Sequence, residues 1–186
     1  MLFVLGGASG SGKSTLLPLL RAAHPSVRWH DFDERWQGGG KAERQRLLEG
    51  WIETALEHAG DFGLLGPCPL GEVLAAPSSA RLSDVRHLLL DVGDVERIRR
   101  LRARGDGLAS QDMLNWAAWL RAHEVYPDWR PDVLIEDGWS EMRWERWHER
   151  PDVAWPGSTF DATSLTPGQT ASRVVAWARS SGNLGV

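Results

Sequence analysis

The residues best suited to chemistry lie near the start of the chain, where one short stretch fits the pattern G-x-x-x-x-G-K-[ST]. The stretch reads Gly7-Ala8-Ser9-Gly10-Ser11-Gly12-Lys13-Ser14, and Thr15 follows it. Glycines let consecutive backbone N–H groups point inward as a nest for anions, and the N-terminus of a following helix adds positive potential. We therefore expect the loop and Thr15 to bind the phosphates of a nucleoside triphosphate.

Three side chains of this stretch have more specific expected roles. Lys13 can reach the β- and γ-phosphates, the Ser14 hydroxyl can ligate Mg²⁺, and Thr15 can reach the α-phosphate. The alternative is a Gly/Ser turn that fits the pattern by accident. The motif follows an apolar run, Leu2–Leu5, and precedes an apolar helical pattern, and this position favours the phosphate-binding interpretation.

A second candidate group is the pair Asp31 and Asp33, which directly follows the predicted strand at 27–30. Ligands of open α/β sheets lie beyond the carboxyl ends of the strands, so the pair is expected near the γ-phosphate. Asp31 could hold Mg²⁺ through water, and Asp33 could accept a proton from an acceptor hydroxyl. The alternative is a helix N-cap and turn, and both interpretations can hold together.

The third group is an arginine-rich helix at 94–104. Its spacing predicts a buried stripe of Val95, Ile98 and Leu101, and a separate stripe formed by Arg97, Arg100 and Arg104. Such a stripe could stack on a base, clamp phosphates and stabilise charge on the transferred phosphoryl group. The alternative is an exposed basic face paired with Glu96 or Asp106.

The elements that would position these groups alternate in type, which predicts an α/β fold with a five-stranded parallel sheet. The predicted strands are 2–5, 27–30, 62–65, 87–91 and Val133–Ile135. The predicted helices are 13–23, 41–58, 70–76, 94–104, 111–123 and 167–180. We expect residues 1–186 to form a single domain, with an insertion at about 105–157 that supplies a lid and the acceptor side.

Composition excludes several classes of protein. The net charge of −4 and the isoelectric point of about 5.9 give no general attraction to nucleic acid or to an anionic membrane. Cys68 is the only cysteine, so an internal disulfide is impossible, and no His and Cys residues have zinc-like spacing. Without a long apolar run, and with a strand at the very start where a signal peptide would lie, the expected location is the cytoplasm.

The loop, the aspartate pair and the arginine helix together resemble the small P-loop kinases of the nucleoside/nucleotide-kinase-like group, such as shikimate kinase, gluconate kinase and chloramphenicol phosphotransferase. The resemblance covers about the first 110 residues and the final helix. It implies a three-layer α/β/α sandwich with a short helical lid, and Mg²⁺ and ATP as cofactors. By analogy, Asp31 serves Mg²⁺ and Asp33 holds the acceptor hydroxyl.

The same resemblance assigns further residues on the donor side. Arg100 would pack on the adenine and Arg104 would approach the phosphates, so the catalytic set becomes Lys13, Asp33, Arg100 and Arg104. The segment Phe160-Asp161-Ala162-Thr163 is similar to the one that closes the adenine pocket. The chain departs from the group after Gly105, because 106–112 contains no arginine. Arg104 or Arg121 would have to supply that charge.

The acceptor side matches no pattern, and the Trp-rich stretch 116–155 has no counterpart in the group. Position relative to the predicted strands and lid nominates seven residues: Arg44, Gly66, Cys68, Glu72, Trp116, Trp119 and His123. Each has a structural alternative, such as a solvated helix residue, a small buried thiol, a helix cap or a core aromatic.

Three functions compete at this level. The first is an ATP- and Mg²⁺-dependent phosphotransferase that moves the γ-phosphoryl group to a hydroxyl of a nucleoside, sugar acid, metabolite or antibiotic. The second is a nucleotide-binding ATPase or switch module that acts on a protein partner, although the chain has no N-K-x-D motif and no strand ending in Asp-Glu. The third is a polynucleotide 5′-kinase, which the acidic isoelectric point makes less favourable.

Overall fold

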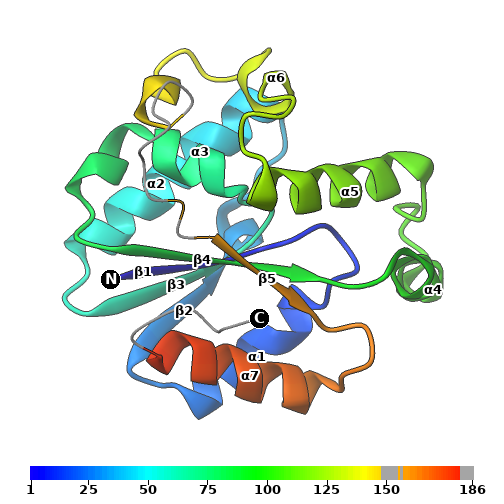
Figure 1. Ribbon diagram of the computed structural model, residues 1–186. Helices are drawn as coiled ribbons and strands as arrows, with labels where there is room; N and C mark the ends of the chain where they lie inside the picture. The colour runs from blue at the N-terminus through cyan, green and yellow to red at the C-terminus, as the bar shows by residue number, and fades with distance from the viewer. Residues whose placement is uncertain (148–154, 156, 181–186) are drawn as a thin grey trace.

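A five-stranded, wholly parallel sheet forms the centre of the computed structural model, which describes residues 1–147, 155 and 157–180. The strands are β1 (Leu2–Gly6), β2 (Val27–Asp31), β3 (Asp61–Leu65), β4 (Val85–Asp91) and β5 (Gly157–Asp161). Their order across the sheet is β2-β3-β1-β4-β5. Because all strands run the same way, their carboxyl ends meet at one edge (Figure 1).

Helices cover both faces of the sheet, which confirms the predicted three-layer α/β fold (Figure 1). Helices α1 (Lys13–Ala23) and α7 (Pro167–Arg179) pack on one face. The other face carries α2 (Lys41–Glu57), α3 (Leu70–Ala75), α5 (Gln111–Val125) and the single turn α6 (Asp132–Ile135). Helix α4 (Asp94–Arg104) lies at the end of the sheet, beyond β4. The described part of the chain also contains three short 3₁₀ segments: η1 (Phe32–Arg35), η2 (Pro77–Arg81) and η3 (Trp144–Arg146).

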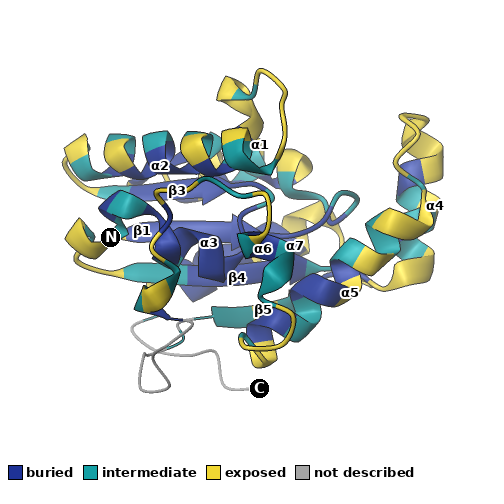
Figure 2. Cartoon of the chain, turned by 90° about the horizontal axis from the view of Figure 1, so that it is seen from above, coloured by how far each residue is buried: buried dark blue, intermediate teal, exposed yellow. Residues whose placement is uncertain are grey.

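Successive side chains of a strand point to opposite faces of the sheet, so the strands contribute to two separate cores. Phe3 and Leu5 of β1 pack with α1 and α7, whereas Val4 points to the opposite face and packs with α2. Figure 2 shows the inner strands almost entirely buried between these layers, while α4 exposes most of its surface. Within the described ranges, no helix combines the length and the apolar character needed to cross a bilayer.

The prediction of a strand at Val133–Ile135 is wrong, because this segment forms α6 and the fifth strand is Gly157–Asp161. Val and Ile favour strands, but Pro131 starts a helical turn here, and its carbonyl oxygen accepts hydrogen bonds from the N–H groups of Leu134 (2.9 Å) and Ile135 (3.1 Å). The true fifth strand lies at the sheet edge and is only half-buried, so it carries one large apolar residue, Phe160, and gives a weak apolar signal.

The tryptophans mostly fill the core, as aromatic residues commonly do. Trp29, Trp51 and Trp177 are fully buried, and Trp119 and Trp147 nearly so. Trp119 and Trp147 belong to a third apolar cluster, between α3, α5 and α6. Trp129 is the exception, with 52% of its surface exposed.

The close contact between Trp29 and Gly63 generates a stability prediction. A Cβ atom at residue 63 would lie 2.1 Å from Cε3 of the Trp29 ring, so Gly63→Ala should destabilise the fold by about 1–3 kcal/mol. Urea unfolding followed by circular dichroism measures this free energy.

Gly50→Ala is the matched control, because a Cβ at this position of α2 meets nothing within 4 Å. Alanine is the better helix former, so this variant should gain about 0.5–1 kcal/mol. Equal free energies of unfolding for the two variants would contradict the proposed packing of Trp29 on Gly63.

Candidate active site

The loop predicted to bind phosphates lies between β1 and α1, at the carboxyl edge of the sheet. Gly10 and Gly12 have φ angles of 84° and 102°, in the left-handed region that favours glycine. Gly10 also faces α4 closely, since a Cβ there would lie 3.1 Å from Cγ of Arg97 and 3.2 Å from Cγ of Leu101. The glycines therefore provide both the curl of the loop and its close approach to α4.

Lys13 begins α1 and turns its amine back into the loop. Its Nζ donates hydrogen bonds to the carbonyl oxygens of Gly7 (2.6 Å) and Ala8 (3.3 Å) and to Oγ of Ser11 (3.2 Å). Burial lowers the pKa of Lys13 to about 8, with a smaller contribution from the positive charge of Arg97. The ammonium thus lies inside the curl of the loop, where phosphate oxygens would stabilise its charge.

Asp31 and Asp33 both line the same cavity as the loop. Asp31 ends β2 and caps η1, because its Oδ1 accepts a hydrogen bond of 3.0 Å from the backbone N–H of Asp33. Burial and the negative charge of Asp31 raise the pKa of Asp33, while Lys13 acts in the opposite direction. The pair therefore combines the two interpretations of the sequence, a helix cap and a carboxylate pair at the phosphate loop.

The cavity has a volume of about 980 Å³, which suits a nucleotide together with a small acceptor. Every nucleotide-binding residue predicted from the motif lines it, as do Arg100, Arg104, Gly66, Pro67 and Trp116. These residues follow different strands, and the parallel sheet brings them together at its carboxyl edge. The cavity, the nest geometry and Lys13 fit a bound nucleoside triphosphate, and Ser14 and Asp31 provide the oxygen ligands that Mg²⁺ prefers.

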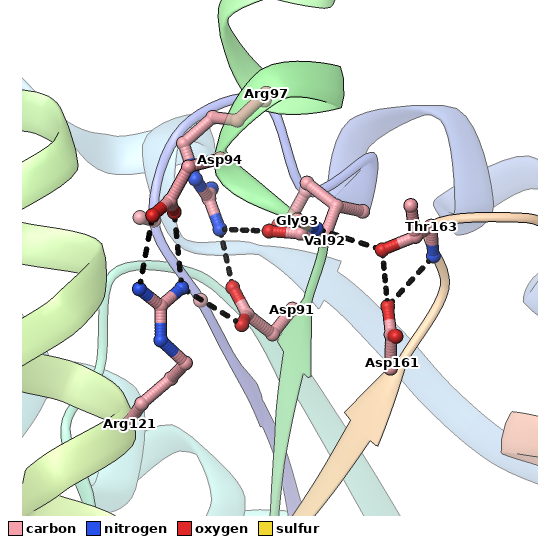
Figure 3. Close-up of polar contacts among 12 residues, drawn as sticks. Asp91, Val92, Gly93, Asp94, Arg97, Arg121, Asp161 and Thr163 are labelled. Atoms are coloured by element: carbon pink, nitrogen blue, oxygen red, sulfur yellow. Dashed lines mark hydrogen bonds and ion pairs between the residues drawn. The ribbon is translucent and has the colours of Figure 1, made fainter.

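The predicted arginine stripe on α4 is wrong for Arg97 and Val95. Arg97 is fully buried and Val95 is 88% exposed, the reverse of the expectation. The Arg97 guanidinium donates to the carbonyl oxygen of Ser9 (2.8 Å). It also donates to the carbonyl oxygen of Val92 (3.2 Å) and forms a buried ion pair with Asp91 (Figure 3). A buried charge is tolerated when it is paired. The network therefore orients α4 with Arg97 inward and Val95 outward, whereas the sequence pattern predicted the opposite orientation.

Arg100 and Arg104 do line the cavity, as the sequence predicted. Nε of Arg100 donates to Glu96 (2.7 Å), and its Nη1 lies 3.4 Å from the carbonyl oxygen of Gly10 in the phosphate loop. Arg104 is more exposed and pairs with Asp106. Arg121, the other candidate for the lid charge, does not line the cavity, because it is bound to Asp91 (3.1 Å) and Asp94 (3.2 Å).

The segment 162–167 connects β5 to α7 and forms one wall of the cavity. The strand that carries Asp31, β2, lies at the other edge of the sheet. Oγ1 of Thr163 accepts a hydrogen bond of 2.7 Å from the backbone N–H of Gly93, and Asp161 accepts one of 2.8 Å from the N–H of Thr163 (Figure 3). The network thereby joins the ends of β4 and β5. Of the four residues that the resemblance assigned to the adenine pocket, Ala162 and Thr163 line the cavity, whereas Phe160 and Asp161 do not.

The nominated acceptor residues separate into two groups. Gly66 and Trp116 line the cavity, whereas Arg44, Cys68, Glu72, Trp119 and His123 lie behind it. Arg44 forms a two-pronged ion pair with Glu72, whose side chain is fully buried. The Cys68 thiol is buried, which raises its pKa well above the usual range, so it is a poor nucleophile. Burial also lowers the pKa of His123 to about 3, so this imidazole is neutral.

The sequence interpretation missed several lining residues, among them Leu108, Met113 and Pro67. Met113 lies one helical turn before Trp116 on α5, so helical periodicity alone could have paired the two. Leu108 and Pro67 belong to loops, and no periodicity predicts the direction of a loop side chain.

Comparisons with known proteins assign the fold. No protein-family model and no curated protein matches the sequence. Among solved structures, the tunicamycin resistance protein of Deinococcus radiodurans is 14% identical, with a TM-score of 0.58 over 96% of this chain and 95% of that one. A sugar kinase from a Janibacter species is 15% identical, with a TM-score of 0.57 over 95% and 93% of the two chains. Shikimate kinase from Acinetobacter baumannii, in complex with shikimate, is 13% identical, with a TM-score of 0.54 over 95% and 92%.

The chain has the fold of the P-loop kinases. Within this P-loop kinase fold the glycine loop, Lys13 and Asp31 occupy the carboxyl edge of the sheet. Identities this low concern the fold alone, so the acceptor must be argued from this chain's own residues.

The buried pair of Arg97 and Asp91 generates a prediction about stability. Arg97→Met leaves Asp91 without its buried partner and the Ser9 carbonyl without its donor, so it should cost about 3–5 kcal/mol. Chemical denaturation gives this difference in the free energy of unfolding.

Arg99→Met is the matched control on the same helix. The Arg99 side chain is 69% exposed and pairs only with Glu96 among the described residues, so its loss should cost less than about 1 kcal/mol. Similar losses in the two variants would show that the Arg97 network does not hold α4 against the loop.

Proposed function

We propose that this protein is an ATP- and Mg²⁺-dependent phosphotransferase whose acceptor is a hydroxyl group of a small molecule. One observation supports this most: the glycine loop, Lys13, Asp33 and Arg100 all line a single cavity of about 980 Å³. A switch protein needs the phosphate cradle alone, whereas a carboxylate with a raised pKa beside that cradle suits proton transfer from an acceptor.

The residues divide between donor and acceptor. The loop amides, Lys13, Ser14 and Thr15 bind the phosphates, and Arg100 and Arg104 add positive charge from α4. ATP supplies the phosphoryl group. Ser14, and Asp31 through water, would hold Mg²⁺, which would supply positive charge to offset the negative charge that develops on the transferred group. We assign the segment 105–157 to the lid and the acceptor side, and we place the reaction in the cytoplasm, where ATP is available.

Asp33 acts on the acceptor hydroxyl. It orients the hydroxyl and takes its proton as the acceptor oxygen bonds to the γ-phosphorus. The bond between that phosphorus and the β–γ bridging oxygen breaks at the same time, so ADP leaves and a phosphate monoester forms. Partial burial and the negative charge of Asp31 raise the pKa of Asp33, which makes the carboxylate a stronger base than an unperturbed aspartate.

The roles of Lys13 and Asp33 can be tested with paired variants. Lys13→Ala should abolish nucleotide binding and turnover, and Asp33→Asn should lower kcat by about 100-fold or more while leaving the Kd for Mg·ADP nearly unchanged. Turnover is measured as ADP release with a library of hydroxyl compounds, and binding is measured by calorimetry.

Lys41→Ala is the control, since Lys41 is the chain's only other lysine and it donates to the carbonyl oxygen of Glu136, away from the cavity. If the wild-type protein transfers phosphate to no compound but hydrolyses ATP when a protein partner is added, the proposed function is wrong and the switch interpretation replaces it.

The lowered pKa of Lys13 predicts proton uptake on nucleotide binding. With a pKa of about 8, the free amine is largely neutral at pH 9, and the phosphates of bound ADP favour the charged form. Binding at pH 9 should therefore take up about one proton per ADP. At pH 7 the amine is already charged and this uptake should be absent.

Calorimetry in two buffers with different ionisation enthalpies counts these protons. Lys13→Arg keeps a positive charge that is fully protonated at pH 9, so this variant should bind ADP without the uptake. An uptake at pH 9 that persists at full size in Lys13→Arg would assign the proton to another group.

A further inference from the structure

Helix α5 contributes two apolar side chains to the cavity, Met113 and Trp116, and the loop before it contributes Leu108. Helix α5 lies with α3 and α6 on the face of the sheet opposite α1 and α7 (Figure 1). The segment 162–167 leads into α7, so it belongs to the other side of the cavity. The apolar wall thus stands apart from the wall assigned to the adenine.

Trp116 is the end of a rigid aromatic stack. Its ring lies parallel to that of Trp119, with centroids 5.3 Å apart and planes 10° apart, and Trp119 stacks in the same way on His123 at 4.7 Å. The two inner members are anchored, because Nε1 of Trp119 donates to the carbonyl oxygen of Arg130 (3.2 Å) and Nε2 of His123 accepts from the N–H of Gly71 (3.1 Å).

Of these three rings, only Trp116 lines the cavity. A ring held in place by its neighbours loses little conformational freedom when a ligand packs on it. The stack therefore offers a preorganised flat surface to whatever binds beside it.

The charges of the cavity are unevenly distributed. Within the described part of the chain, the lining cations are Lys13, Arg99, Arg100 and Arg104, all from the phosphate loop or α4. The lining residues at the carboxyl ends of β2 and β3 are Asp31, Asp33, Gly66 and Pro67, and they include no cation.

The nearby arginines do not supply the missing positive charge. Arg44 is paired with the fully buried carboxylate of Glu72, and Arg121 with Asp91 and Asp94. Neither lines the cavity. Lys13 interacts electrostatically with Asp31 and Asp33, but the donor phosphates would engage its charge. A carboxylate or phosphate on an acceptor would therefore meet the two aspartates without a free cation, which lowers its affinity.

We propose that the acceptor is an alcohol without negative charge that carries a flat ring, and that this ring packs on Trp116 while the hydroxyl lies at Asp33. This inference rests on the proposed function and narrows its acceptor class. Sugar acids and phosphorylated alcohols are disfavoured, whereas uncharged ring-bearing alcohols are accepted. Trp116 is thus the residue that determines specificity, and Met113 and Leu108 complete the apolar wall.

A matched pair of ligands tests the charge preference. The compounds 4-(hydroxymethyl)benzamide and 4-(hydroxymethyl)benzoate share ring and hydroxyl and differ in charge. Binding of each to the Mg·ADP-loaded protein is measured by ligand-observed NMR titration, which requires no turnover. We expect the benzamide to bind at least about tenfold more tightly than the benzoate.

Variants of Trp116 test the stacking. Trp116→Ala should weaken benzamide binding about tenfold, and Trp116→Phe should retain most of the affinity because it keeps a flat ring. Trp129→Ala is the control, since Trp129 is 52% exposed and does not line the cavity, and it should bind the benzamide as the wild type does.

A third variant tests the charge independently of the stack. Met113→Lys introduces an ammonium group into the apolar wall and should shift the ratio of affinities toward the benzoate by about fivefold. Met113 is only partly buried, so the change does not place a lysine in the core.

The outcomes separate this inference from the proposed function. Equal or tighter binding of the benzoate, absence of benzamide binding at millimolar concentration, or a Trp116→Ala variant indistinguishable from Trp129→Ala would each overturn the inference. Phosphoryl transfer to sugar acids alone would overturn it too, while upholding the phosphotransferase. Benzamide binding that depends on Trp116, with no transfer to any alcohol, would uphold the ring site and overturn the phosphotransferase.

Discussion

The buried guanidinium of Arg97 is the interaction on which the arrangement of the site depends. It lies where the phosphate loop, the end of β4 and the start of α4 meet, and it bonds to Ser9, Asp91 and Val92. A full charge in such a place is stable only when it is paired and hydrogen-bonded, so the three segments that supply its partners must keep this spacing together. The glycine at residue 10 is part of the same constraint, because the Arg97 side chain occupies the space that a larger residue would need.

The orientation of α4 follows from that anchor. With Arg97 turned inward, Leu101 one turn later also faces the loop, and Arg100 and Arg104 lie along the cavity. The carboxylate of Asp91 accepts from Arg121 of α5 as well, so α4 and α5, the helices on either side of the loop 105–110, share one acceptor (Figure 3). The cavity-lining arginines of α4 and the whole of α5 are in this way positioned by the same end of β4.

Much of this architecture could be predicted from the sequence, and the exceptions have physical causes. The phosphate loop, the aspartate pair and four of the five strands followed from local pattern, because glycine spacing and buried apolar runs are local properties. The edge strand Gly157–Asp161 could not be recognised, since a half-exposed strand needs few apolar residues. Arg97 was predicted to face the cavity because periodicity assigns charge to the outside, and only the tertiary partner Asp91 reverses that assignment. Only Trp116 of the packed aromatic stack reaches the cavity, and the spacing of residues along α5 does not determine which ring does so.

The packing of α1 and α7 in one core has a consequence for how the chain folds during its synthesis. Helix α1 directly follows the glycine loop, yet its buried face packs against α7, which lies far later in the chain. Since a chain emerges from the ribosome N-terminus first, the helix that supports the loop stays partly uncovered until α7 is available. The glycine loop is therefore translated well before the helix that completes its support.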